Sequence, residues 1–268
     1  MPKTPLRYPG GKSRAVKHIL PLIPEDITEL CSPFLGGGSV ELAVAARGTP
    51  VHAYDIFKPL VWFWNALLRD PRLLAVCADS YRKEHPDFEE GRGLLKEDFS
   101  LFRDELRREG HFSYDNAAKF YAINRSSFSG ATFSGGWSKR ASYKRFTDSS
   151  IERIYQFREP NITVSCEDFK TSIRRHPGAF LYCDPPYLLG PEKESLYGDK
   201  GAAHVGFDHK GLHDALSQRS GWVLSYNDCP EIRDLYKNYE IREAEWAYGM
   251  KNIGGKKMGK SSEILIIG

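Results

Sequence analysis

Residues 27–55, ITELCSPFLGGGSVELAVAARGTPVHAYD, carry the pattern that decides the fold. The apolar run at 27–31 predicts a strand, and the glycine-rich turn after it leads into a predicted helix over 39–46. A second strand is predicted over 51–54, and it ends in Asp55. A strand, a turn, a helix and a second strand in this order predict an α/β protein with a parallel sheet.

The glycine-rich turn has the features of a ligand site. Phe34, Gly36 and Gly38 lie in it, and glycine lets the backbone approach a ligand closely. Asp55, at the end of the next strand, can accept hydrogen bonds from both hydroxyls of a ribose. The turn lacks the full G-x-G-x-x-G spacing of dinucleotide sites, because position 41 is Glu41. The pattern therefore favours an adenosyl ligand without a pyrophosphate.

The rest of the chain predicts a larger sheet with an insert. Five more strand-like runs, of which the last two are expected to pair as a hairpin, lie at 162–166, 179–183, 222–226, 241–247 and 263–267. Helical patterns dominate before them, and Gly135-Gly136 is a hairpin signal. We predict a mixed, mostly parallel seven-stranded α/β core with helices on both faces, formed by 1–58 and 161–268. A helical and β-hairpin module is inserted at 59–160.

Asp184-Pro185-Pro186-Tyr187 directly follows the apolar run at 179–183. Ligands of open α/β sheets bind at the carboxyl ends of the strands. The Asp184 carboxylate and the Pro185 carbonyl can each accept one N–H of an exocyclic amine, since proline offers an acceptor and no competing donor. The Tyr187 ring can stack on the base that carries this amine. The alternative is an ordinary turn after a strand, because Asp and Pro are common turn residues.

Two further segments are candidates for the same site. The turn at 8–12 is interpreted as backbone amides and a lysine that approach the carboxylate end of a cofactor; its members are Tyr8, Pro9, Gly10, Gly11 and Lys12. A P-loop is excluded because Leu6 stands where that motif needs its first glycine. A helix-capping turn is the alternative. Asp168 is expected to accept from an adenine amino group while Phe169 packs on the ring, although Asp168 would equally serve as a helix N-cap.

Composition and charge set the class of protein. The 268 residues are 41% hydrophobic and 27% charged, which is typical of a globular chain. The net charge is only +3, but segments 1–24, 137–146 and 249–260 contain basic residues and no acid. These segments either converge on a phosphate-binding face or remain separate solvated loops.

The cysteines and the hydropathy restrict the chemistry and the location. Five cysteines, an odd number without a C-x-x-C pair, predict neither a disulfide framework nor a metal site. Cys31, Cys166 and Cys183 end apolar runs and are expected to be buried. With no signal peptide or membrane span in view, we expect an intracellular, cytoplasmic protein. The patternless segment 188–206 is expected to form a mobile lid.

Taken together, these motifs resemble the Dam-like, alpha-group DNA adenine N6-methyltransferases over nearly the whole chain. The resemblance is carried, in the family's order, by residues 8–12, 33–38, 54–55, 120–125, 184–187, 225–228 and the strand of Glu263. It implies S-adenosylmethionine as methyl donor, S-adenosylhomocysteine as product, and a target adenine flipped out of double-stranded DNA. It also implies a bacterial or viral source and a possible cognate restriction endonuclease as partner.

The resemblance assigns roles to positions of this sequence. Catalysis would rest on Asp184, Pro185, Pro186 and Tyr187. The cofactor would be bound by Tyr8, Pro9, Gly10, Gly11, Lys12, Phe34, Gly36, Gly38, Asp55, Asp168 and Phe169. DNA would be bound by Arg7, Arg125, Phe128, Ser129, Lys139, Arg140, Lys144 and Arg145, with the last four contacting phosphates.

Two departures from the family pattern change the expectations. The family commonly has an acid before Pro-Phe-x-Gly, and here it is Ser32, so we expect a charge near the cofactor to be lost. Relatives that read GATC place an Arg where Phe133 stands, which removes a bidentate guanine contact and predicts another recognition sequence. Phe128 can still wedge into the base stack.

Other methyltransferase functions agree less well with the sequence than adenine methylation of DNA. Cytosine N4-methyltransferases more often carry Ser in place of Asp184. Methylation of a cytosine carbon needs a cysteine nucleophile, usually preceded by proline, and no cysteine here follows a proline. Two alternatives remain: an RNA adenine methyltransferase, and a DNA-binding accessory homologue with weak or no catalysis.

Overall fold

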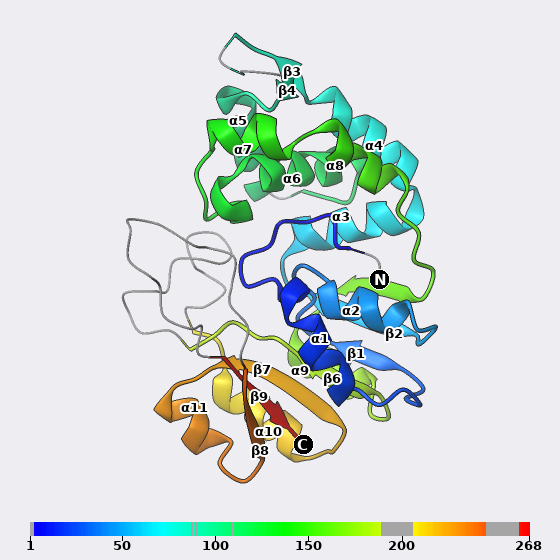
Figure 1. Ribbon diagram of the computed structural model, residues 1–268, viewed down its shortest axis with the longest axis vertical. Coiled ribbons are helices and arrows are strands. Elements are labelled where there is room, and N and C mark those ends of the chain that lie inside the picture. The colour runs from blue at the N-terminus through cyan, green and yellow to red at the C-terminus, as the bar shows by residue number, and fades with distance from the viewer. Residues whose placement is uncertain (1–2, 87, 89–90, 109, 189–205, 245–262) are drawn as a thin grey trace.

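A seven-stranded sheet forms the centre of the molecule (Figure 1). The computed structural model describes residues 3–86, 88, 91–108, 110–188, 206–244 and 263–268. In chain order the sheet strands are β1 (Leu30–Ser32), β2 (Val51–Asp55), β5 (Ile162–Cys166), β6 (Phe180–Cys183), β7 (Trp222–Asn227), β8 (Glu240–Ala244) and β9 (Glu263–Ile267).

The sheet is mixed and mostly parallel, as predicted. Its spatial order is β5-β2-β1-β6-β7-β9-β8. The first five strands in this order run parallel, whereas β9 pairs antiparallel with both β7 and β8. The predicted pairing of the last two strands is therefore confirmed. Parallel strands place their carboxyl ends at one edge, which is where a ligand site is expected.

Helices cover both faces of the sheet. They are α1 (Val16–Ile19), α2 (Ser39–Ala45), α3 (Lys58–Arg69), α9 (Phe169–Arg175), α10 (His209–Ser217) and α11 (Pro230–Leu235). Successive residues of a strand point to opposite faces. On β7, Val223 accordingly joins the apolar cluster that includes α2 and α3, while Trp222 and Leu224 join the cluster that includes α9 and α10. Each face thus has its own core.

A helical module lies beyond α3, at the end of the molecule opposite the β9-β8 edge (Figure 1). It consists of α4 (Pro71–Ser80), β3 (Lys83–Glu84), β4 (Arg92–Gly93), α5 (Lys96–Arg107), α6 (Tyr114–Ser126), α7 (Lys139–Arg145) and α8 (Asp148–Tyr155). The buried helix α6 contacts α3, α4, α5 and α7. Its apolar residues belong to the same cluster as one face of the sheet, so the module and the sheet share a core.

The start of the predicted insert falls inside a helix. Helix α3 begins at Lys58 and packs against β2 and β5 as well as α6. It therefore covers the sheet and supports the module at the same time.

The hairpin expected at Gly135-Gly136 is reduced to one antiparallel bridge, between Ser127 and Trp137. The Phe128 amide donates to the Gly136 carbonyl at 2.9 Å. No ladder follows because Ser138 caps α7 by accepting from the Ala141 amide, which turns the chain into a helix. The two-stranded ladder within the described part of the module is β3–β4.

One smaller expectation is also corrected. Before β1 the chain forms only the single turn α1, because Pro21, which has no N–H to continue the helix, lies in a following 3₁₀ turn. Cys31 and Cys183 are buried as predicted, but Cys166 is exposed at the edge strand β5. Among the described residues, no helix is both long and apolar enough to cross a membrane.

Candidate active site

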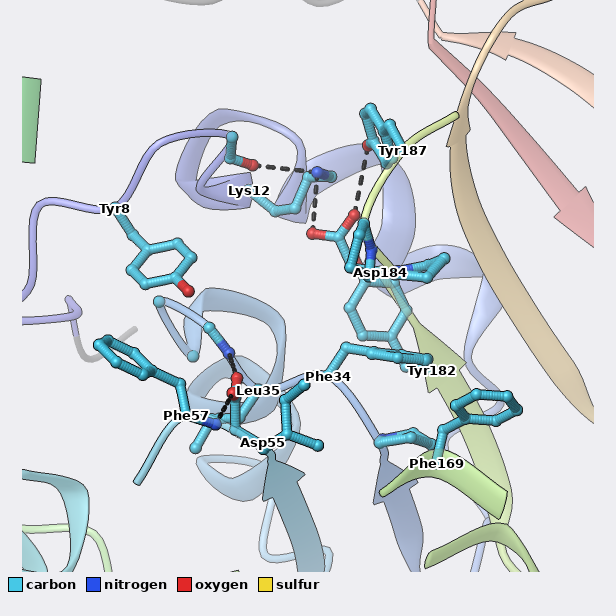
Figure 2. A pocket seen from close by; sticks show the side chains of 18 of the residues that line it. Tyr8, Lys12, Phe34, Leu35, Asp55, Phe57, Phe169, Tyr182, Asp184 and Tyr187 are labelled. Carbon is cyan, nitrogen blue, oxygen red and sulfur yellow. Dashed lines mark hydrogen bonds and ion pairs between the residues drawn. The ribbon is translucent and has the colours of Figure 1, made fainter. Parts of the chain in front are cut away.

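A cavity of about 490 Å³ opens at the carboxyl ends of β1, β2 and β6. Its lining comes from the candidate segments of the sequence together with part of α2 and the residues that lead into α10; it consists of residues 8–12, 33–41, 55–57, 168–170, 182, 184–187 and 206–208. The predicted catalytic and cofactor residues thus surround one space (Figure 2). The lid expected at 188–206 lies almost wholly outside the described residues.

The glycine turn is shaped by the protein that packs against it. Gly36 and Gly38 have φ angles of +47° and +66°, the left-handed region that favours glycine. A Cβ at Gly36 would lie 3.0 Å from the Tyr8 ring, and one at Gly38 would lie 2.6 Å from the Trp64 ring. The sequence predicted that the glycines let a ligand approach the backbone. In the structure their missing side chains leave room for these two aromatic rings. Tyr8 is thereby held at the cavity wall.

Asp55 lies at the end of β2 and is fixed by backbone amides (Figure 2). Its Oδ2 accepts from the Gly36 amide at 3.1 Å, and its Oδ1 accepts from the Phe57 amide at 2.9 Å. Burial raises the pKa of Asp55, and these hydrogen bonds counteract the rise. Each oxygen keeps a further lone pair, so Asp55 can still accept from ribose hydroxyls, and that contact stays a prediction.

Asp168 caps α9. Its Oδ1 accepts from the amides of Lys170 and Thr171, and its Oδ2 accepts from the Thr171 hydroxyl at 2.6 Å. These bonds lower the pKa of Asp168. The N-cap alternative is therefore what the structure shows, although Asp168 also lines the cavity.

Aromatic rings form one wall of the cavity. Phe169 lies 5.8 Å from Phe34 and 5.4 Å from Phe207, centroid to centroid. Phe34 and Phe207 are 5.6 Å apart, edge to face. Three mutually packed rings suit the face of a flat base. The sequence pointed to Phe34 and Phe169 but not to Phe207, which carries no motif and is placed by the N-cap Asp208 of α10.

Lys12 is held by acids rather than left for an anionic ligand. Its Nζ lies 2.9 Å from Asp184 Oδ2 and 3.7 Å from Glu263 Oε1, and it donates to the Gly10 carbonyl. The Lys12 side chain is almost fully buried. In this arrangement the Lys12 ammonium offsets the charge of Asp184, and its approach to a cofactor carboxylate stays a prediction.

Asp184 is the centre of this network (Figure 2). The Tyr187 hydroxyl lies 3.2 Å from Asp184 Oδ1 and 2.7 Å from Glu263 Oε1. Removal from water raises the pKa of Asp184, an effect that Lys12 opposes and Glu263 reinforces. The Tyr187 ring itself stacks on Tyr226 at 5.7 Å. Pro185 and Pro186 complete the rim beside Asp184.

The carboxyl group that the family commonly has at position 32 is supplied here by a neighbouring element. Ser32 is fully buried and donates to Glu41 Oε1 at 2.6 Å. Glu41, on α2, is 2% exposed and lines the cavity. Burial raises the pKa of Glu41 to about 7, and Asp184 adds to the rise while Ser32 and Lys12 oppose it. The signal that could have found Glu41 is its position as the one charged residue of Ser39–Ala45.

Comparison with known proteins decides the family. The family model of D12 class N6 adenine-specific DNA methyltransferases matches residues 8–250. The chain belongs to this family. The DNA adenine methylase of Serratia marcescens is 30% identical over 253 residues, which cover 87% of this chain and 86% of that protein.

Other relatives extend the similarity. The DNA adenine methylase of Vibrio cholerae is 28% identical over 248 residues, covering 88% of this chain and 85% of that protein. The type II methyltransferase M1.LlaDCHI of Lactococcus lactis is 22% identical over 280 residues, covering 97% and 93%. The protein is an adenine-specific DNA methyltransferase with the Rossmann-like core of that class.

An adenine methyltransferase of DNA must also hold a polyanion, and the helical module offers a basic surface. Lys139, Arg140, Lys144 and Arg145 are all exposed on α7. Phe128 is 57% exposed, and its neighbour Ser129 has a φ of +54° that turns the chain sharply there. These predicted DNA contacts remain predictions that the geometry permits.

Two basic segments of the sequence meet at this surface. The Arg7 guanidinium donates to the Ser127 carbonyl, and the Arg7 carbonyl accepts from Asn124. Burial, Arg125 and Arg145 lower the pKa of Arg7 to about 10. Segments 1–24 and 137–146 therefore come together, whereas nearly all of 249–260 is outside the described residues.

Arg125 is interior, unlike the other cations of the predicted DNA-binding set. It is 8% exposed, and its Nε donates to the Arg145 carbonyl at 2.8 Å while Nη1 donates to the Pro5 carbonyl. Its guanidinium ties the N-terminal segment to the end of α7. Phe133 is also interior, and its ring lies 5.2 Å from that of Phe57, edge to face.

Proposed function

We propose that this methyltransferase transfers the methyl group of S-adenosylmethionine to the N6 amine of an adenine flipped out of duplex DNA. The observation that supports this most is the position of Asp184. Its carboxyl lies at the edge of a 490 Å³ cavity, beside Tyr187, while the glycine turn and Asp55 line the same space. A donor inside the cavity and an amine at its rim would meet at Asp184.

The lining residues suit the proposed cofactor. Asp55 can accept from ribose hydroxyls, and the rings of Phe34, Phe169 and Phe207 can hold an adenine face. The wall near Asp184 carries buried carboxyl groups, which suits a ligand with positive charge. What S-adenosylmethionine supplies when bound is a methyl group on a positively charged sulfur.

Asp184 and Pro185 would prepare the amine. The Asp184 carboxylate and the Pro185 carbonyl would each accept one N–H of the amine. These two hydrogen bonds would draw the nitrogen out of conjugation with the ring and direct its lone pair into the cavity. The donor would supply the methyl group to this nitrogen, with the sulfur as leaving group, and Asp184 would accept the proton that the nitrogen then loses. Positioning and electrostatics would account for most of the rate, without a covalent enzyme intermediate.

Residues 59–160 would bind the duplex. The N6 amine is engaged in base pairing, so the base must leave the stack. Phe128 is placed to fill the gap, and the cations of α7 to hold phosphates. Because Phe133 is interior, we propose a recognition sequence other than strict GATC. The type II names of several relatives extend the proposal to a partner restriction endonuclease.

Methyl transfer tests the proposal directly. Radiolabelled S-adenosylmethionine and unmethylated duplex DNA are incubated with the protein, followed by nucleoside analysis and mapping of modified sites. N6-methyladenine within a short fixed sequence is the expected product. The same single strand and an RNA of the same sequence serve as controls. Label on cytosine, or on RNA in preference to DNA, would overturn the assignment of the substrate.

A further inference from the structure

Glu41 is a buried acid that the proposed reaction has not yet used. Its carboxyl lines the cavity, and within the described part of the chain no ion pair joins it to a cation. Its side-chain partner is a hydroxyl, that of Ser32 at 2.6 Å. A buried carboxylate without a cation is costly, so an acid kept here calls for a positive ligand.

The other acids of the cavity are already engaged. Asp184 pairs with Lys12, Asp55 accepts two backbone amides, Asp168 caps α9, and Asp208 caps α10 and pairs with Lys170. Glu41 therefore differs from all four: it is buried, it faces the cavity, and its charge is not matched by the protein.

The position of Glu41 indicates which part of the ligand it meets. Asp184 and Lys12 are near enough to influence its ionisation. The methyl group must reach an amine at Asp184, so the sulfur must lie near Asp184 as well. A short carbon chain joins that sulfur to the α-ammonium of the amino-acid end. The ammonium is thus the cation that can reach Glu41.

We propose that Glu41, oriented by Ser32, binds the α-ammonium of the methyl donor and releases a proton to solvent when it does so. This rests on the proposed use of S-adenosylmethionine. The O–H bond of the neutral Glu41 carboxyl breaks, and the carboxylate pairs with the ammonium. Because of this contact, the methyl donor would bind tightly only when its α-amino group carries a positive charge.

The proton release follows from the groups around Glu41. Lys12 favours the charged form, whereas Asp184 disfavours it; the Tyr182 hydroxyl and Glu263 also lie in this cluster. With burial dominant, the pKa of Glu41 is about 7, so much of the unliganded protein holds the proton at neutral pH. A bound ammonium lowers that pKa. Affinity should therefore rise with pH up to about 7 and level off above it.

Isothermal titration calorimetry between pH 5.5 and 7.5 tests the proposal, below the range near 8 where an α-amino group loses its own proton. The ligands are S-adenosylmethionine, S-adenosylhomocysteine and 5′-methylthioadenosine, which lacks the amino-acid end. The proteins are wild type, Glu41→Gln and Ser32→Ala. Two buffers of different ionisation enthalpy report the protons released. Glu41→Gln keeps the size of the side chain and an acceptor for Ser32.

Glu41→Gln should bind both amino-acid ligands roughly 10- to 100-fold more weakly at pH 7.5, the range for losing a hydrogen bond to a charged group. Its proton release should vanish, and its affinity for 5′-methylthioadenosine should equal that of wild type. Ser32→Ala keeps the acid but loses a bond that lowers its pKa, so the pH dependence should move upward.

The outcomes separate the two proposals. Equal weakening for all three ligands would mean that Glu41 only shapes the cavity, and unchanged affinity for S-adenosylmethionine would mean that the ammonium lies elsewhere; either overturns the role of Glu41. Wild-type protein that binds neither amino-acid ligand would overturn the cofactor itself and this inference with it.

Discussion

The cavity and the α7 surface both depend on charge, yet they hold it in opposite ways. In the cavity, Lys12 and Glu41 are almost fully buried, and Lys12 influences the ionisation of both Glu41 and Asp184. On α7 the basic side chains are exposed and screened by water and salt. A single change in the cavity should therefore have a large, specific effect, whereas single changes on α7 should be small and should add.

The largest expected effect is on catalysis. Asp184→Asn should reduce methyl transfer at least ~10²-fold, because the variant loses the negative acceptor that holds the amine and leaves Lys12 with only the more distant Glu263 as its ion-pair partner. Affinity for S-adenosylmethionine should change little. Single-turnover transfer and calorimetric binding measure the two quantities. Rates within a factor of two of wild type would remove Asp184 from the chemistry.

Arg125 belongs to the basic region by sequence but is buried like the charged residues of the cavity, so its substitution should change stability. Arg125→Ala should lower the free energy of unfolding by about 2–3 kcal/mol, because the carbonyls of Arg145 and Pro5 lose a buried donor. Urea denaturation measures the change, with the exposed Arg140→Ala as a control expected within about 0.5 kcal/mol. A stable Arg125→Ala protein with weakened DNA binding would restore the original expectation for this residue.

The exposed cations should act on DNA through salt-dependent binding. Lys139→Ala with Arg145→Ala should weaken duplex binding about tenfold near physiological salt and flatten the slope of log K against log salt by ~1.8, about 0.9 per phosphate contact. The Arg145 backbone carbonyl that Arg125 needs is kept. Binding by fluorescence anisotropy over a range of salt measures the slope. Lys210→Ala with Lys237→Ala, exposed on or next to helices of the sheet's other face, is the control pair. Equal slopes for both pairs would mean that α7 does not bind DNA.

The smallest expected effect is on stability, and it has a definite sign. The pKa of Glu41 in the folded protein, about 7, is above its ordinary value of 4.5, so stability falls as pH rises through that interval. Glu41→Gln removes this loss. Without ligand, its unfolding temperature should exceed that of wild type at pH 8, by ~2–4 °C for each kcal/mol recovered, and match it at pH 4. A lower unfolding temperature at pH 8 would show that the acid stabilises the free protein.

Much of the fold was predictable because its signals are local. Apolar runs bounded by turn residues identified all seven strands of the sheet, and β5 and β9 have the expected ends. The motifs at 8–12, 33–38 and 184–187 line one cavity, as expected for the carboxyl ends of parallel strands. Strand and helix boundaries elsewhere moved by a few residues, since caps such as Ser138 depend on atomic contacts.

What a charged residue does was less predictable than where it lies. The sequence by itself determined the sheet, the place of the cavity and the residues at its rim, since these follow from hydrophobic periodicity and short motifs. Only the tertiary structure decided that Lys12 pairs with Asp184, that Arg125 is interior, and that Glu41 supplies a carboxyl beside Ser32. Burial and partner are set by segments far apart in the chain, and they determine whether a charge binds a ligand, neutralises a neighbour or stabilises the fold.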